Sequence, residues 1–222
     1  MVFSSLSFLF LFLPALLAVY FLVPRRYREG RNAVLLLFSL GFYGCGGWRL
    51  LPLILVSITM NYVFGLLAAP GRRRRKAALV GAVACNLGLL FVFKYLGFVT
   101  ANLHALLPSV PGLTILLPIG ISFYTFQAMS YVIDVYRGDA AAERSFLHVA
   151  LYVVLFPQLV AGPIVRYSTV AEEIRCRRES ADDMAEGLQR FLFGLAKKVL
   201  LANQMGLIAD AAFSQTAPRL SM

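Results

Sequence analysis

Long apolar runs separated by short basic segments are the main pattern of this chain. Phe3 to Val23 carries no charge over 21 residues, and Asn32 to Trp48 carries none over 17. A helix needs about 20 mostly apolar residues, within a range of about 17 to 25, to cross a bilayer. Further apolar segments are Leu50–Ala69, Ala77–Tyr95 and Thr114–Gly138. The pattern therefore predicts an all-α polytopic membrane protein.

Composition and charge placement agree with a membrane protein. The 222 residues are 59% hydrophobic and 14% charged, whereas soluble domains are about 25% charged. The net charge of +10 lies mainly in clusters between the apolar runs, such as Arg25 to Arg31 and Arg72 to Lys76. Such clusters mark the cytoplasmic side of membrane proteins and attract anionic lipid. We expect membrane lipid and no nucleic acid as partner, and an N-terminus outside the cytoplasm.

The segment from Thr114 to Gly138 carries polar side chains at helical spacing. Tyr124, Gln127, Tyr131 and Asp134 are separated by three, four and three residues, which places them on one helix face. An acid in an apolar segment normally faces the bundle interior or water. This polar stripe either joins helices by hydrogen bonds or lines a substrate passage, and the pattern leaves both open.

The apolar run from Ser145 to Val165 is unusual because basic residues flank it on both sides. It has no charge over 21 residues, yet Arg144 precedes it and Arg166 follows it. Its last third contains two prolines and one glycine. Non-helical backbone is tolerated at membrane depth only where protein or a water-lined cavity satisfies it. We therefore predict a broken or re-entrant segment with both ends on the cytoplasmic side.

The remaining segments have weaker signals. Phe98 to Gly112 contains two prolines and is predicted to be an external or interfacial loop. The hydrophilic stretch 167–186 is predicted to be a cytoplasmic loop with short helices. Gly187 to Asp210 has an apolar stripe at helical spacing and is predicted to be an amphipathic helix, either interfacial or lining a polar interior.

The sequence shows no recognised motif for catalysis. The chain has two histidines, His104 and His148, and three scattered cysteines, without the spacing of a triad, a phosphate loop or a metal site. We expect no catalytic residue in this chain and no metal. The chain stops at Met222 without a cap or an anchor, which suggests a fragment.

Three longer motifs carry a family resemblance: LPIGISFYTFQAMSYVIDVYRG (117–138), FPQLVAGPIVRY (156–167) and FLFGLAKKVLLAN (191–203). Together they resemble the membrane-bound O-acyltransferase family, and most closely its bacterial alginate O-acetyltransferase-like branch. The opening MVFSSLSFLFLFLPALLAVYFLVP and the segment NAVLLLFSLGFYGCGGW resemble the same branch. The resemblance extends over nearly the whole chain.

The resemblance implies a fold and an activity. The fold would be a ring of membrane helices around a funnel, of which this chain supplies an incomplete part with about 6–8 helices in a single membrane domain over 1–222. The activity would be transfer of an acetyl or another short acyl group from a cytoplasmic donor towards an extracytoplasmic polysaccharide such as alginate. The essential histidine of the family lies in later motifs that nothing here matches. This chain would therefore be the N-terminal half, inactive alone.

The resemblance also implies partners and residue roles. It suggests an acyl-CoA or an acyl-carrier thioester as co-substrate, no bound cofactor, an acetylation partner protein in the periplasm or membrane, and a multi-pass location in the bacterial inner membrane. The polar stripe (Tyr124, Gln127, Tyr131 and Asp134) would line the substrate passage. The donor side would be formed by Pro157, Gln158, Gly162, Pro163, Arg166, Lys197 and Lys198.

Two other functions remain open at this point. A transporter or flippase for a cell-envelope polysaccharide or lipid-linked substrate also uses broken helices and polar groups at membrane depth. A structural membrane subunit would use the polar stripe only for helix packing. Acyl transfer from a labelled donor would separate the first function from both alternatives.

Overall fold

Helices and their connections make up the whole of the described structure. The computed structural model describes residues 3–107, 116–159 and 162–214, and no strand occurs in these ranges. Two compact units are distinguished, one of residues 15–177 and a smaller one that combines residues 1–14 with 178–222. The all-α class predicted from the apolar runs is confirmed.

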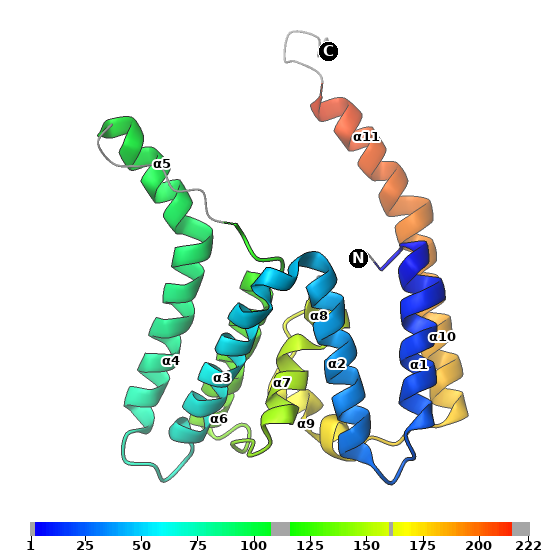
Figure 1. Cartoon of the computed structure of the whole chain (residues 1–222), viewed down its shortest axis with the longest axis horizontal. Helices are drawn as coiled ribbons and strands as arrows, with labels where there is room; N and C mark the ends of the chain where they lie inside the picture. Colours follow the sequence, from blue (N-terminus) through cyan, green and yellow to red (C-terminus); the bar gives the residue numbers. More distant parts are fainter. Residues whose placement is uncertain (1–2, 108–115, 160–161, 215–222) are drawn as a thin grey trace. The chain divides into compact units, whose positions relative to one another are not determined.

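The larger unit is a set of antiparallel helices (Figure 1). The chain rises along α2, turns through a short 3-10 helix (Trp48–Leu50), descends along α3, rises along α4 and descends along α6. A π-helical turn (Phe91–Tyr95) joins α4 to α5 without a break. The helices are α2 (Arg28–Gly47), α3 (Leu51–Ala68), α4 (Arg75–Leu90), α5 (Leu96–Leu106), α6 (Ile121–Arg137), α7 (Phe146–Val154), α8 (Phe156–Leu159) and α9 (Tyr167–Cys176).

Three helical stretches are long and apolar enough to cross a membrane among the residues described. Two lie in the larger unit, Arg28–Ala68 and Arg75–Leu106, and one lies in the smaller unit, Ala181–Phe213. The first contains the turn at Trp48–Leu50, so α2 and α3 are two antiparallel legs (Figure 1). These stretches establish a polytopic helical membrane protein.

The core of the larger unit lies where α3, α4, α6 and α7 pack together. Ile54 and Ile58 of α3 and Ala128 and Val132 of α6 are fully buried there. Gly65 of α3 leaves room for the Tyr131 ring of α6, because a Cβ atom at this position would lie 2.4 Å from Cε1 of Tyr131. Small residues allow helices to approach closely in membranes, where packing replaces the hydrophobic effect as the main attraction between helices.

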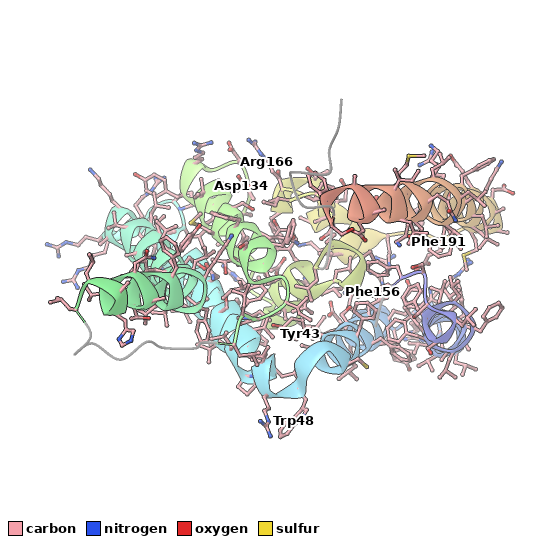
Figure 2. The ribbon with its side chains drawn as sticks, turned by 90° about the horizontal axis from the view of Figure 1, so that it is seen from above. Tyr43, Trp48, Asp134, Phe156, Arg166 and Phe191 are labelled. Carbon is pink, nitrogen blue, oxygen red and sulfur yellow. The ribbon has the colours of Figure 1, made fainter. Side chains whose placement is uncertain are left out.

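The basic segments of the larger unit lie at one end of it. The α1–α2 turn, the α3–α4 turn, the α6–α7 connection and α9 all lie at the lower edge in Figure 1. Trp48 lies at the opposite end, where it projects from the α2–α3 turn (Figure 2) and is 71% exposed. This agrees with the prediction that the basic clusters share one side. Which side of a membrane they occupy stays a prediction.

The run from Ser145 to Val165 is broken, as predicted. Leu155 separates α7 from α8 with a non-helical ψ of 114°, and α7 has only nine residues. Nine helical residues span about 14 Å, less than half of a hydrocarbon core. The Tyr152 hydroxyl donates to the carbonyl oxygen of Val165 at 2.7 Å, so the returning chain lies against the ascending helix. Residues 160 and 161 of this motif lie outside the described residues.

Both ends of the broken segment meet at the basic end of the larger unit. The Tyr167 hydroxyl, at the start of α9, donates to Glu143 Oε2 at 2.7 Å, just before α7 begins. The chain therefore enters and leaves on the same side of this unit. The structure confirms the paired ends, and the cytoplasmic location of both ends remains to be tested.

The smaller unit contains the first residues of the chain and one long helix. A π-helical turn (Phe8–Phe12) leads into α1 (Leu13–Leu22), which continues into the larger unit. The long helix consists of α10 (Ala181–Ala196), a π-helical turn (Lys197–Ala202) and α11 (Asn203–Phe213). It starts at Ala181, earlier than the predicted Gly187, because Ser180 and Asp183 form a capping box. Residues 215–222 lie outside the described residues.

The predicted loop from Phe98 to Gly112 is wrong for its first part, which is helical to Leu106. No glycine or proline occurs from Phe98 to Leu107. The polar side chains bond back to the helix, since the Thr100 hydroxyl donates to Leu96 O at 2.9 Å and Asn102 Nδ2 donates to Phe98 O at 2.8 Å. The two prolines of the segment, Pro108 and Pro111, lie outside the described residues.

Candidate functional site

The polar stripe of α6 lies inside the larger unit. Tyr124, Gln127, Tyr131 and Asp134 are all at most 3% exposed. The helical spacing therefore predicted their common burial correctly. A polar group buried away from water needs a hydrogen-bond partner to offset its desolvation, so the partners of each side chain define what the stripe does.

Gln127 connects the polar stripe to the broken segment. Its Nε2 donates to the Tyr152 carbonyl oxygen at 2.5 Å and to Gln158 Oε1 at 3.0 Å. The Tyr152 hydroxyl lies 3.2 Å from the Ser130 hydroxyl, one helical turn further along α6. Gln127, which was predicted to line the passage, is therefore in direct contact with Gln158, which was predicted for the donor side.

Proline and glycine give the broken segment its shape. Pro157 lies in the short helix α8, directly after the break at Leu155. At Gly162 a Cβ atom would lie 2.6 Å from Cα of Gln158, so a side chain is excluded there. The Gly162 N–H donates to the Gln158 carbonyl oxygen at 3.1 Å. The return of the chain thus requires glycine at 162, while the neighbouring Pro163 is exposed.

Asp134 lies at the end of the polar stripe next to Arg166. Figure 2 shows the two residues beside each other, and the Arg166 charge interacts with the Asp134 carboxyl group. The Asp134 carbonyl oxygen accepts backbone N–H groups of Gly138 and Asp139 at 3.0 and 2.9 Å. Its side-chain Oδ2 is buried and has no hydrogen-bond partner in the described part of the chain. This oxygen can accept a hydrogen bond from a further group.

Lys197 and Lys198 belong to the smaller unit. Both are exposed and lie in the π-helical turn between α10 and α11, and Lys198 Nζ donates to Asn203 Oδ1 at 2.9 Å. Such turns are frequent at functional sites. The role of Lys197 and Lys198 on the donor side remains a prediction.

Glu143 is the centre of a buried network that the sequence analysis missed. Its Oε2 accepts from Arg175 Nη2 at 2.6 Å and from the Tyr167 hydroxyl at 2.7 Å, and its Oε1 accepts from the Ser145 N–H at 3.0 Å. The Tyr131 hydroxyl accepts from the Glu143 N–H at 3.0 Å. The network ties the α6–α7 connection to α6 and α9.

Electrostatics hold Glu143 in its charged form. Burial raises the pKa of Glu143, but the hydrogen bonds from Ser145, Tyr167 and Arg175 and the positive charge of Arg175 outweigh burial and lower it to about 2. A carboxylate with so low a pKa is a weak base. Glu143 therefore fastens the segments at this end of the unit, and proton transfer by its carboxylate is disfavoured.

His148 lies between two carboxylates from distant parts of the chain. Its Nε2 is 2.9 Å from Glu29 Oε1 of α2, and its Nδ1 is 3.4 Å from Glu143 Oε2. The sequence does not predict the contact between His148 and Glu29, because Glu29 is 119 residues away. The position of Glu143, two residues before the predicted broken segment, was the available sequence signal for it. In the described ranges no three His, Cys, Asp or Glu side chains form a metal-binding group.

The fold and this site define a polytopic membrane protein with a buried polar helix face bonded to a broken segment. Its sequence is 42% identical over 98% of the chain to a "Probable alginate O-acetylase AlgI" of Azotobacter vinelandii, and 42% identical over 98% of the chain to the protein of that name from Pseudomonas aeruginosa. It is also 30% identical over 97% of the chain to a peptidoglycan O-acetyltransferase of Helicobacter pylori. These relatives confirm the resemblance to bacterial O-acyltransferases that the motifs predicted.

The chain spans less than half the length of these relatives, namely 45%, 43% and 47% of them in the same order. No family model matches the chain. No solved structure matches it either.

Proposed function

We propose that this chain is the part of a membrane O-acyltransferase that forms a passage for the acyl group and receives its donor. The observation that carries the proposal is the 42% identity to alginate O-acetylases over 98% of the chain. The reaction would place acetyl or another short acyl group on an extracytoplasmic polysaccharide such as alginate. A periplasmic or membrane acetylation protein would act as partner.

The donor in this proposal is an acyl thioester, either an acyl-CoA or an acyl-carrier thioester. The acceptor hydroxyl oxygen attacks the thioester carbonyl carbon, the C–S bond breaks, and the thiol leaves with a proton. A general base must take the hydroxyl proton. The family resemblance gives that role to a histidine in a later motif, so this chain would be inactive without the segment that supplies it.

The buried face of α6 suits the passage. Gln127 joins the polar stripe to Gln158 of the broken segment, and Asp134 keeps a buried oxygen that can accept a hydrogen bond. Arg166 lies beside Asp134 at the basic end, where an anionic donor would approach. The stripe would thus run from the donor end into the membrane.

Transfer from a radiolabelled acetyl donor tests the proposal. Membrane vesicles containing the full reading frame are compared with vesicles containing Asp134→Asn or Gln127→Leu, with the exposed Thr59→Val on α3 as control. We expect at least tenfold slower transfer for the first two, with normal amounts of folded protein, and unchanged transfer for the control. Equal transfer in all variants would remove the passage role. Movement of polysaccharide without acyl transfer would favour the flippase alternative.

Cysteine labelling tests the membrane orientation that the proposal requires. Cys45, near the α2–α3 turn, and Cys176, at the basic end, are both exposed. In intact spheroplasts a membrane-impermeant maleimide is expected to label Cys45, while Cys176 reacts only after the membrane is opened. Cys85→Ser removes the third thiol. The reverse pattern would contradict an inner-membrane protein with its N-terminus outside.

A further inference from the structure

The α1–α2 turn forms a basic hollow at the end of the larger unit. A hollow of about 480 Å³ is lined by the consecutive residues from Arg25 to Gly30. Three of these six are arginines, Arg25, Arg26 and Arg28, and all three are exposed. A membrane protein needs basic residues near a turn for its orientation, but that need alone does not require arginines around a hollow.

Two further arginines, Arg31 and Arg177, stabilise the chain around this hollow. Arg31 is only 4% exposed, donates from Nε to the Val23 carbonyl oxygen at 2.9 Å, and lies over the Tyr20 ring with its Cζ 4.9 Å from the centroid. Arg177, the residue that directly follows α9, donates to the Tyr20 hydroxyl at 2.7 Å and to Asn32 Oδ1 at 2.6 Å. These contacts fix the two sides of the turn to α9.

The acids near the hollow are already engaged. Glu29, which lines it, has its Oε1 at 2.9 Å from His148 Nε2. Glu143, whose Oε2 lies 3.4 Å from Nδ1 of the same histidine, accepts from Arg175 and Tyr167. Arg28 also contacts α9, since its Nη1 donates to the Arg175 carbonyl oxygen at 3.5 Å. The lining of the hollow thus carries three arginines against one carboxylate, that of Glu29.

We propose that this hollow binds a phosphate ester. Guanidinium groups present paired N–H donors that match phosphate oxygens, and they bind phosphate more selectively than a diffuse positive field does. The first turn of α2, which begins at Arg28 in the lining of the hollow, has no side-chain cap, and an uncapped helix N-terminus favours an anion nearby. The phosphate comes either from an anionic phospholipid headgroup or from a soluble phosphate ester. The proposal stands independently of the acyltransferase function.

Two binding assays on the purified chain separate the two sources. In the first, radiolabelled pyrophosphate is dialysed to equilibrium against the protein in phosphatidylcholine nanodiscs. In the second, native mass spectrometry counts phosphatidylglycerol molecules retained from mixed micelles. The test variant is Arg26→Gln with Arg28→Gln. The matched control, Arg73→Gln with Arg74→Gln, removes the same charge from the exposed α3–α4 turn at the same end.

We expect the test variant to weaken binding at least tenfold in one of the assays, and the control to change it less than twofold. Loss of pyrophosphate binding assigns the site to the phosphate group of a soluble compound, and loss of phosphatidylglycerol assigns it to a headgroup. Equal losses in both variants would show a diffuse charge effect and overturn the proposal. Absence of saturable binding in both assays would overturn it as well. Elution of both variants as monodisperse peaks controls for folding.

Discussion

Asn61 and Asn86 join α3 to α4 by a reciprocal pair of amide hydrogen bonds. Asn61 Nδ2 donates to Asn86 Oδ1 at 3.1 Å, and Asn86 Nδ2 donates to Asn61 Oδ1 at 2.8 Å. Each amide also donates to the carbonyl oxygen four residues earlier, on Ser57 and Ala82. Both side chains are fully buried, so their polar groups depend on each other.

Replacing one asparagine of this pair should cost more than replacing both. Asn61→Leu leaves the Asn86 amide without its partner in an apolar interior, and we expect the free energy of unfolding to fall by about 1–2 kcal/mol. The double variant Asn61→Leu with Asn86→Leu leaves no orphan and should recover part of this loss. Denaturant titration in micelles measures both. A double variant at least as unstable as Asn61→Leu would contradict the pairing.

Gly65→Ala should weaken the α3–α6 packing. The added Cβ atom would lie 2.4 Å from Tyr131 Cε1, and forcing a helix pair apart costs about 1–3 kcal/mol. Gly41→Ala in α2 is the control, because a Cβ atom at Gly41 meets nothing within 4 Å. It should be neutral or stabilising by up to about 1 kcal/mol. Similar thermal stability for the two variants would show that Tyr131 moves aside freely.

Gly120 and Gly138 lie at the two ends of α6. Alanine at these positions distinguishes the cost of a positive φ from the cost of a steric clash. Both have a positive φ, 72° and 88°, so alanine should cost about 1–2 kcal/mol at either position. At Gly120 the Cβ atom would also lie 2.7 Å from the Leu159 carbonyl oxygen, while at Gly138 it meets nothing within 4 Å. The free energy of unfolding of Gly120→Ala should therefore be lower than that of Gly138→Ala by about 1 kcal/mol. Equal thermal midpoints for the two variants would mean that the broken segment can move away from the added Cβ atom without loss of stability.

Glu143→Gln should destabilise the larger unit in a pH-dependent way. Since the folded-state pKa of Glu143 is lowered to about 2, its carboxylate stabilises the fold above its ordinary pKa near 4.5, and this stabilisation is lost as the pH falls towards 2. We expect Glu143→Gln to reduce the free energy of unfolding by about 2–3 kcal/mol at pH 7.

The difference between Glu143→Gln and the unmodified chain should shrink steadily as the pH is lowered from 5 to about 2. Glu173→Gln on the exposed side of α9 is the control and should change stability by less than about 0.5 kcal/mol. Unfolding titrations at several pH values check both. A difference that stays constant down to pH 2 would mean that the carboxylate charge is not the cause.

Local patterns in the sequence determined the class of the protein and the main features of its helices. The uncharged runs predict α2, α3 and α4, because spanning a bilayer requires that length of apolar helix. The spacing of Tyr124 and Gln127 predicts their common face, since the helical period is a property of the backbone. The paired basic ends and the prolines of the Ser145–Val165 run predict its break.

Only the tertiary structure decided which polar groups meet. Glu29 and His148 are 119 residues apart, and Asn61 and Asn86 belong to different helices. Their pairing depends on how the helices pack, and helical period carries no information about a partner on another helix. Glu143 is an ordinary acid in the sequence, and burial with Arg175 makes it the centre of a network. Local chemistry thus fixes where polar groups lie on each helix, whereas packing selects their partners.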